Sequence, residues 1–107
     1  MNKLSACLFL CCVSLSALAD GNQVSAKRVQ TLYQAHCQAC HATGKDSAPK
    51  TGDIGDWGER LMAGIESLVE VTQKGTKVMP PKGGCNECSD AELQAIIEMM
   101  STDANGG

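Results

Sequence analysis

The sequence is poor in aromatic residues and has no excess of positive charge. Of its 107 residues only Phe9, Tyr33 and Trp57 are aromatic, and twelve acidic side chains outnumber nine basic ones. A chain without a basic stripe lacks the electrostatic footprint of a nucleic-acid-binding protein, so nucleic acid is not expected as a partner. So short a chain also buries little surface, and such chains commonly depend on a disulfide, a metal or another staple.

The sequence also lacks an apolar run of the length that a membrane span requires. The uncharged stretch from Leu4 to Ala19 is 16 residues long, whereas a span needs roughly 18 or more. Lys3 precedes this stretch and Ala17-Leu18-Ala19 ends it, which is the pattern of a cleavable secretory signal peptide. We therefore expect residues 1–19 to direct the chain to the periplasm, with an uncleaved membrane anchor as the alternative.

By length, residues 20–107 form one small domain of 88 residues. No useful stretch alternates apolar and polar residues with a period of two, and no segment is repeated. Apolar residues recur instead every three or four positions, which indicates helices. The fold class is therefore expected to be all-α.

Two segments near the ends of this domain carry complete helix patterns. Ser25 can cap a helix over about Ala26–His36, and Ser89-Asp90-Ala91-Glu92 fits a capping box that opens a last helix. The apolar stripes that we expect to be buried are Val29, Leu32 and Tyr33 in the first helix and Leu93, Ile96, Ile97 and Met100 in the last. Thr102 to Gly107 is expected to fray.

The middle of the domain is predicted as a loop, a helix and a second loop. Thr43–Asp56 is rich in turn residues, and Trp57–Lys74 is helical in pattern, with a break at Gly64 and a glycine stop at its end. Gly75–Asn86 contains Met79-Pro80-Pro81, whose adjacent prolines exclude a helix or an inner strand. The apolar stripe of the central helix is Trp57, Leu61, Ile65, Leu68 and Thr72, and Met62 beside it is an expected core residue.

The segment from Cys37 to His41 has the Cys-x-x-Cys-His spacing at which a c-type haem is attached. Each thiol adds across one haem vinyl group, and His41 then offers a ring nitrogen to the iron. Five residues also match by chance, and a thioredoxin-like redox pair or half of a zinc site are alternatives. A covalently held haem would supply the apolar volume that the chain is short of.

An iron with one histidine ligand has an open sixth position, and Met79 is the candidate for it. The other methionines of the domain lie in expected helices, whereas Met79 lies in the Pro/Gly loop. A methionine in such a loop has no evident role unless its thioether sulfur binds a soft partner. Met/His ligation raises the haem potential and leaves no vacancy for oxygen chemistry. The alternative is a loop methionine that merely packs on the haem. His36 cannot easily reach the opposite face and is expected to be an exposed or packing histidine.

With these residues in place, the sequence resembles the class I c-type cytochromes and is most similar among them to the cytochrome c5 family. The matching segments follow the family's order through nearly all of the domain: Cys37–Gly44, Ala48–Lys50, Gly52-Asp53, Trp57 with Arg60, Met79–Gly84 and Cys85–Asp90. A second Cys-x-x-Cys after the methionine loop distinguishes the c5 group. The resemblance implies a small class I cytochrome c fold, with N- and C-terminal helices packed around one covalently bound haem c.

The resemblance also implies roles for individual residues. It assigns haem attachment to Cys37 and Cys40, and iron ligation to His41 and Met79. Pro49 lies where the family places a carbonyl that accepts the ring N–H of the histidine ligand, which fixes its tautomer. Trp57 and Arg60 are candidates for contacts with the haem propionates, and the alternative for Arg60 is a solvated helix residue.

The second cysteine pair, Cys85 and Cys88, is implied by the resemblance to form a disulfide. Two Cys-x-x-Cys pairs also match the ligand set of a zinc ribbon, but 44 residues separate the pairs, well beyond the roughly 15–20 of the usual spacing. Export to an oxidising compartment likewise favours a disulfide. We expect this bond to hold the Met79 loop against the last helix.

These patterns predict a periplasmic mono-haem electron carrier that is not an enzyme. The resemblance implies redox partners such as a membrane respiratory complex, a terminal oxidase or a reductase, and it leaves a homodimer open. Three alternatives are a peroxidase-like haem enzyme, a thiol–disulfide redox enzyme and a zinc-binding structural module. The lysines that could steer an acidic partner are interleaved with aspartates, which favours an ordinary mixed surface; they are Lys45, Lys50, Lys74, Lys77 and Lys82.

Overall fold

The computed structural model describes residues 23–102, so the predicted signal peptide and the end of the expected frayed tail lie outside the described residues. Helices make up the regular structure of this part, and no strand occurs in it, as the all-α prediction requires. The α-helices are α1 (Ala26–His36), α2 (Gln38–His41), α3 (Ile54–Met62), α4 (Ile65–Lys74) and α5 (Asp90–Met100), and the 3₁₀ turns are η1 (Lys45–Ser47) and η2 (Pro81–Gly84). Within residues 23–102, no helix has the length and apolar character needed to cross a bilayer.

The first and last helices begin at the predicted caps. The Ser25 hydroxyl accepts the Arg28 backbone N–H at 3.1 Å, and Ser89 and Glu92 form the expected capping box, each side chain accepting the other's backbone N–H. The predicted stripes of both helices are buried. These predictions are confirmed, because caps and apolar spacing are properties of the local sequence.

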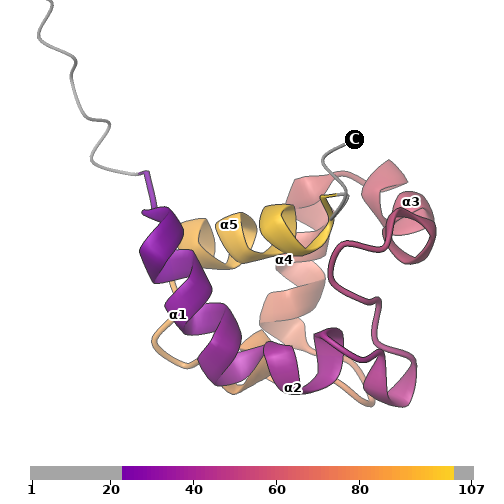
Figure 1. Ribbon diagram of the computed structural model, residues 1–107, viewed down its shortest axis with the longest axis horizontal. Coiled ribbons are helices and arrows are strands. Elements are labelled where there is room, and N and C mark those ends of the chain that lie inside the picture. The colour runs from indigo at the N-terminus through magenta and orange to yellow at the C-terminus, as the bar shows by residue number, and fades with distance from the viewer. Residues whose placement is uncertain (1–22, 103–107) are drawn as a thin grey trace, which may run out of the picture.

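The core lies where α1, α4 and α5 pack on one another. Helix α5 contacts both α1 and α4, and Figure 1 shows α1 and α5 crossing, with α3 at the opposite end of the molecule. Leu32 and Ile96 are among the most completely buried side chains of this core. Helix α1 therefore delivers the chain from the core directly to Cys37.

The central segment differs from the prediction at its start and on its surface. Helix α3 begins at Ile54, inside the expected loop, because the Asp53 carboxylate accepts the Asp56 backbone N–H at 3.2 Å and caps the helix. The break at Gly64 and the stop at Gly75 are confirmed. The predicted burial of Leu61 and Met62 is wrong, since they are 37% and 87% exposed in the structure.

The loop after α4 makes one short turn whose backbone angles are not those of a right-handed helix, so the expected exclusion of regular helix by its prolines holds. Pro81–Gly84 forms η2, a single 3₁₀ turn that begins with a proline at its first position. Proline is tolerated there because its missing N–H would have no helical partner. Lys82 and Gly83 have positive φ angles, 57° and 60°, so the turn cannot continue as an α-helix.

Candidate functional site

The first cysteine pair lies at a junction between two helices. Cys37 ends α1, where its backbone N–H donates to the Tyr33 carbonyl at 2.9 Å, and its own carbonyl accepts the His41 N–H at 3.0 Å to open the single turn of α2. One helical turn thus carries Cys37, Cys40 and His41. Spacing of three and four residues in a helix places side chains on neighbouring positions of one face.

The two thiols of this junction are unequal. Among the cysteines that the structure describes, Cys37 and Cys40 are free, the first partly buried and the second exposed. Burial raises the pKa of the Cys37 thiol to about 11, so this group is a protonated thiol at neutral pH. Neither sulfur takes part in a disulfide, so the pair can supply two sulfurs to one attached group.

The loop that follows α2 fixes the imidazole of His41. This side chain is buried, and its Nδ1 lies 2.8 Å from the Pro49 carbonyl oxygen. A carbonyl oxygen can only accept, so Nδ1 carries a proton and donates, and in the neutral imidazole Nε2 is then the nitrogen with the lone pair. The backbone closes around the same residue, because Thr51 N–H donates to the His41 carbonyl at 2.8 Å. The geometry leaves Nε2 as the free ligand atom.

Trp57 supports this imidazole from α3. Its ring lies 6.0 Å from that of His41 between centroids, with 24° between the planes. The indole N–H donates to the Lys50 carbonyl at 2.8 Å, and the side chain is buried. Trp57 therefore braces the loop that holds the histidine, a role that its place on an apolar stripe did not indicate.

Arg60 lies on the exposed surface of α3. One of its guanidinium nitrogens donates to the Asp56 carbonyl at 2.6 Å. Arg60 and Trp57 thus both donate to backbone carbonyl groups. Their expected contacts with the haem propionates stay predictions.

Tyr33 and Thr51 form part of the site that no motif indicated. The Tyr33 hydroxyl and the Thr51 hydroxyl lie 2.9 Å apart, and Thr51 holds the His41 carbonyl through its backbone N–H. The first helix and the histidine loop are joined in this way. A buried tyrosine normally finds a partner for its hydroxyl, so a partner was to be expected, although the sequence does not identify Thr51.

Met79 lies in the loop between α4 and η2 and is half-buried. The end of its side chain is close to Gly83, since a Cβ at Gly83 would lie 3.5 Å from the methionine Cε. Gly75 approaches the same loop still more closely: a Cβ there would lie 2.8 Å from the Met79 carbonyl oxygen and 2.7 Å from the Pro81 nitrogen. The path of the methionine loop therefore depends on a glycine at the end of α4.

Cys85 and Cys88 are joined by a disulfide, with an S–S distance of 2.01 Å. Both residues are essentially inaccessible, 0% and 2% exposed. The bond lies between η2 and the Ser89 cap of α5, and the Lys82 ammonium donates to the Cys88 carbonyl at 3.3 Å. The second cysteine pair thus links the end of the methionine loop to the last helix.

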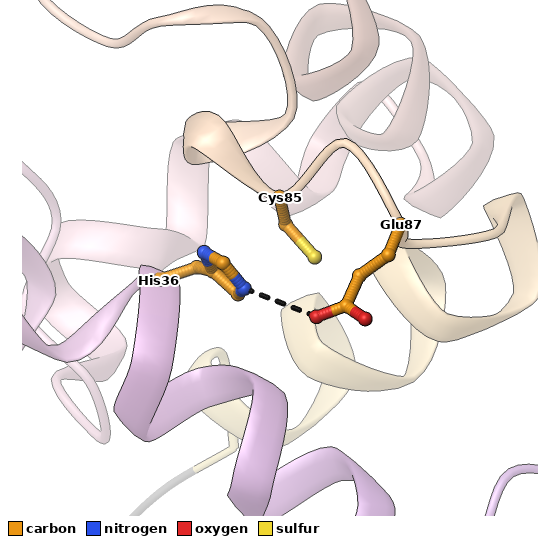
Figure 2. A group of neighbouring side chains, drawn as sticks. All are labelled: His36, Cys85 and Glu87. Atoms are coloured by element: carbon orange, nitrogen blue, oxygen red, sulfur yellow. Dashed lines mark hydrogen bonds and ion pairs between the residues drawn. The ribbon is translucent and has the colours of Figure 1, made fainter.

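His36 faces this disulfide loop from the end of α1. Its Nε2 lies 3.4 Å from a Glu87 carboxylate oxygen, with Cys85 beside them (Figure 2). Three such side chains could in principle ligate a metal, but the Cys85 sulfur is bonded to Cys88 and cannot act as a thiolate. The contact therefore joins α1 to the disulfide loop.

The donor set of residues 37–79 fits a covalently attached haem. It offers two free thiols one helical turn apart, an imidazole with Nε2 unprotonated, and a thioether in a loop constrained by prolines. Thiols at this spacing suit the two vinyl groups, and imidazole and thioether are haem-iron ligands found together in cytochromes c.

Comparisons with known proteins agree with this donor set. A family model described as cytochrome C oxidase, cbb3-type, subunit III matches residues 24–100. The chain is 40% identical over 78 residues to cytochrome c5 of Ectopseudomonas mendocina, covering 71% of this chain and 90% of that protein. It is 47% identical over 68 residues to cytochrome c5 of Azotobacter vinelandii, covering 62% and 82%.

Solved structures give the same fold. The cytochrome c in the crystal structure of an electron transfer complex of nitrite reductase with cytochrome c is 35% identical, with a TM-score of 0.66 over 74% of this chain and 95% of that one. The predicted small cytochrome c fold is therefore confirmed, as is the function of a small electron carrier with one covalently attached haem c. The chain belongs to the class I c-type cytochromes.

Proposed function

We propose that Cys37 and Cys40 form the two thioether bonds to the haem and that His41 Nε2 and the Met79 sulfur bind its iron. The observation that carries this assignment is the 2.8 Å contact between His41 Nδ1 and the Pro49 carbonyl. It fixes the tautomer with Nε2 free, and a hydrogen-bonded imidazole is a more electron-donating ligand. Cys85 and Cys88 are paired with each other, which leaves Cys37 and Cys40 as the described cysteines that can attach a haem.

When bound, the haem takes up and releases single electrons between its ferric and ferrous states. The protein's residues orient and shield it. His41 is held by Pro49 and stacked beside Trp57, so its ring has little freedom to move. Met79, if it held the haem iron through its sulfur, would raise the potential and would leave no iron position open for peroxidase chemistry. We therefore assign the chain to electron transfer and not to catalysis.

A thiol–disulfide exchange activity is disfavoured by burial. Exchange needs a thiolate to reach one sulfur of the disulfide, and Cys85 and Cys88 are 0% and 2% exposed. The pair is better suited to a structural role beside the methionine loop.

We further propose that residues 1–19 are a signal peptide and that the mature protein of residues 20–107 works in the periplasm. Its partners would be redox proteins such as a reductase, a terminal oxidase or a membrane respiratory complex. Support comes from the related cytochrome c that was crystallised in an electron transfer complex with nitrite reductase. Lys45, Lys50 and Lys77 are exposed near the expected haem-bordering loops, with acidic side chains among them.

The ligand assignment is tested on oxidised holoprotein secreted to the periplasm. We expect the methionine-to-iron charge-transfer band in the native spectrum, its loss in Met79→Ala, and a lower reduction potential in that variant, because the thioether favours ferrous iron. Met62→Ala is the matched control, since Met62 is 87% exposed. A Met79→Ala protein that keeps the band, or a native protein without it, contradicts the assignment.

A further inference from the structure

Thr76 makes three hydrogen bonds to the backbone of Val78 and Met79. Its backbone N–H donates to the Met79 carbonyl at 2.8 Å. Its hydroxyl oxygen accepts the backbone N–H of Val78 at 3.2 Å and that of Met79 at 3.0 Å. Both the N–H and the carbonyl of Met79 are therefore bound to one residue.

These bonds constrain a segment that packing does not hold. Thr76, Lys77 and Val78 are exposed, and Val78 is 65% exposed. A side-chain hydroxyl that binds backbone N–H groups two and three residues ahead stabilises a turn in place of regular structure. The close approach of Gly75 to the Met79 carbonyl limits the loop from the other side. The backbone of Met79 is thus positioned mainly by local contacts.

We propose that the Thr76 hydroxyl is a positioning group that keeps the Met79 thioether on the oxidised iron. This inference rests on the proposed ligation by Met79. A soft thioether is a weaker ligand for ferric than for ferrous iron, so the loop geometry decides how often an added ligand can take its place. Thr76→Val keeps the β-branched shape and removes the acceptor of two N–H groups. Loss of these bonds should raise the fraction of the open form roughly 3–10-fold, given their modest net strength in water.

The experiment measures imidazole binding to the oxidised holoprotein, together with the pH at which the charge-transfer band is lost. Thr76→Val is compared with Thr76→Ser, which keeps the hydroxyl. Thr31→Val serves as the matched control, because Thr31 is also exposed and its hydroxyl donates to the Lys27 carbonyl at 2.9 Å, within α1. We expect Thr76→Val to bind imidazole roughly 3–10 times more tightly and to lose the band at a lower pH, while the other two variants match the native protein.

Equal imidazole affinity of Thr76→Val and the native protein overturns the proposal, and so does a Thr76→Ser variant that is as weakened as Thr76→Val. If Thr76→Val does not accumulate as holoprotein, Thr76→Ala provides the same comparison. Failure of the underlying ligation has a different outcome: Met79→Ala would then keep the native band. A band that depends on Met79 but is indifferent to Thr76 overturns only the role of Thr76.

Discussion

Two Cys-x-x-Cys segments of equal spacing differ in pairing and in burial. Cys37 and Cys40, on the turn that carries His41, are not joined to each other by a disulfide. Cys85 and Cys88 are a closed disulfide, with their Cα atoms 5.4 Å apart. The first pair is partly exposed, whereas the second is buried.

Equal spacing therefore does not determine the role of a cysteine pair, and the neighbouring residues do. The first pair is followed by a histidine whose imidazole is oriented by Pro49, so a side chain able to bind a metal lies on the same turn as both sulfurs. The second pair is followed by Ser89, which caps α5, so its neighbourhood serves the helix. In the proposed assignment the first motif attaches the haem, while the second links the methionine loop to α5.

The largest expected effect comes from removing each cysteine pair in turn. A Cys37→Ser, Cys40→Ser double variant should retain no haem after acid–acetone extraction, because both thioether bonds are lost. A Cys85→Ser, Cys88→Ser variant should retain its haem fully. Absorbance of the extracted protein measures both. Loss of haem from the Cys85→Ser, Cys88→Ser variant, or retention of haem by the Cys37→Ser, Cys40→Ser variant, would contradict the roles proposed for the two pairs.

A second prediction concerns the loop between the two motifs. Gly75 has φ 74° and ψ 177°, a region open essentially to glycine, and a Cβ there would meet the backbone of Met79 and Pro81. Gly75→Ala should therefore lower the free energy of unfolding by about 2–4 kcal/mol. Gly58→Ala is the control, because a Cβ at Gly58 meets nothing within 4 Å. Urea unfolding should separate the two variants, and equal stabilities would refute this account of the loop.

The Cys85–Cys88 disulfide should stabilise the protein by less than the upper end of the loss expected for Gly75→Ala. Its loop is short, with a sequence separation of 3, and chain entropy then predicts about 2 kcal/mol of stabilisation. The Cys85→Ser, Cys88→Ser variant, or reduction by a dithiol, should lower the free energy of unfolding measured in urea by this amount. It should also make the Met79 ligand easier to displace, as reported by loss of the charge-transfer band. A reduced holoprotein with unchanged midpoint and spectrum would show that the second pair does not hold the methionine loop.

The smallest expected effect lies beside the second pair, where Glu92 joins α5 to α1. A hydrogen bond from the Arg28 guanidinium, at 2.7 Å, and one from the Ser89 backbone hold the pKa of this carboxyl below its usual value. A lowered pKa contributes stability above the ordinary carboxyl range, which is lost as pH falls through the lowered value. Glu92→Gln should be slightly less stable than the native protein at pH 7, and the difference should disappear in acid. A stability difference between Glu92→Gln and the native protein that persists in acid would show that packing, and not the charge of Glu92, is its cause.

Much of the fold followed from local sequence. The bounds of the first helix, the capping box at Ser89 and the breaks at Gly64 and Gly75 are set within a few residues of chain, and the structure has them as predicted. The start of α3 was missed because Asp53 in a glycine-rich stretch resembles a turn residue as much as a helix cap.

Contacts between distant segments were harder to predict. The stripe of α3 correctly contained the buried Trp57, but a stripe pattern does not tell how far along a helix the packed face extends, so the exposure of Leu61 and Met62 was not foreseen. The pairing of Tyr33 with Thr51 and the indole bond of Trp57 to Lys50 depend on how the loop after α2 folds back. The hydrogen bond from the His41 ring to the Pro49 carbonyl was predicted only by resemblance to a family, because every residue has a backbone carbonyl and the sequence does not distinguish this one.

The central claim is that one pair of cysteines carries the haem while the other is bonded to itself. Mass spectrometry of proteolytic peptides from secreted, unreduced holoprotein tests it directly. The account predicts haem mass on the peptide that contains Cys37 and Cys40, and the loss of two hydrogens on the peptide that contains Cys85 and Cys88. Haem on the second peptide, or free thiols there with no haem on the first, would contradict it.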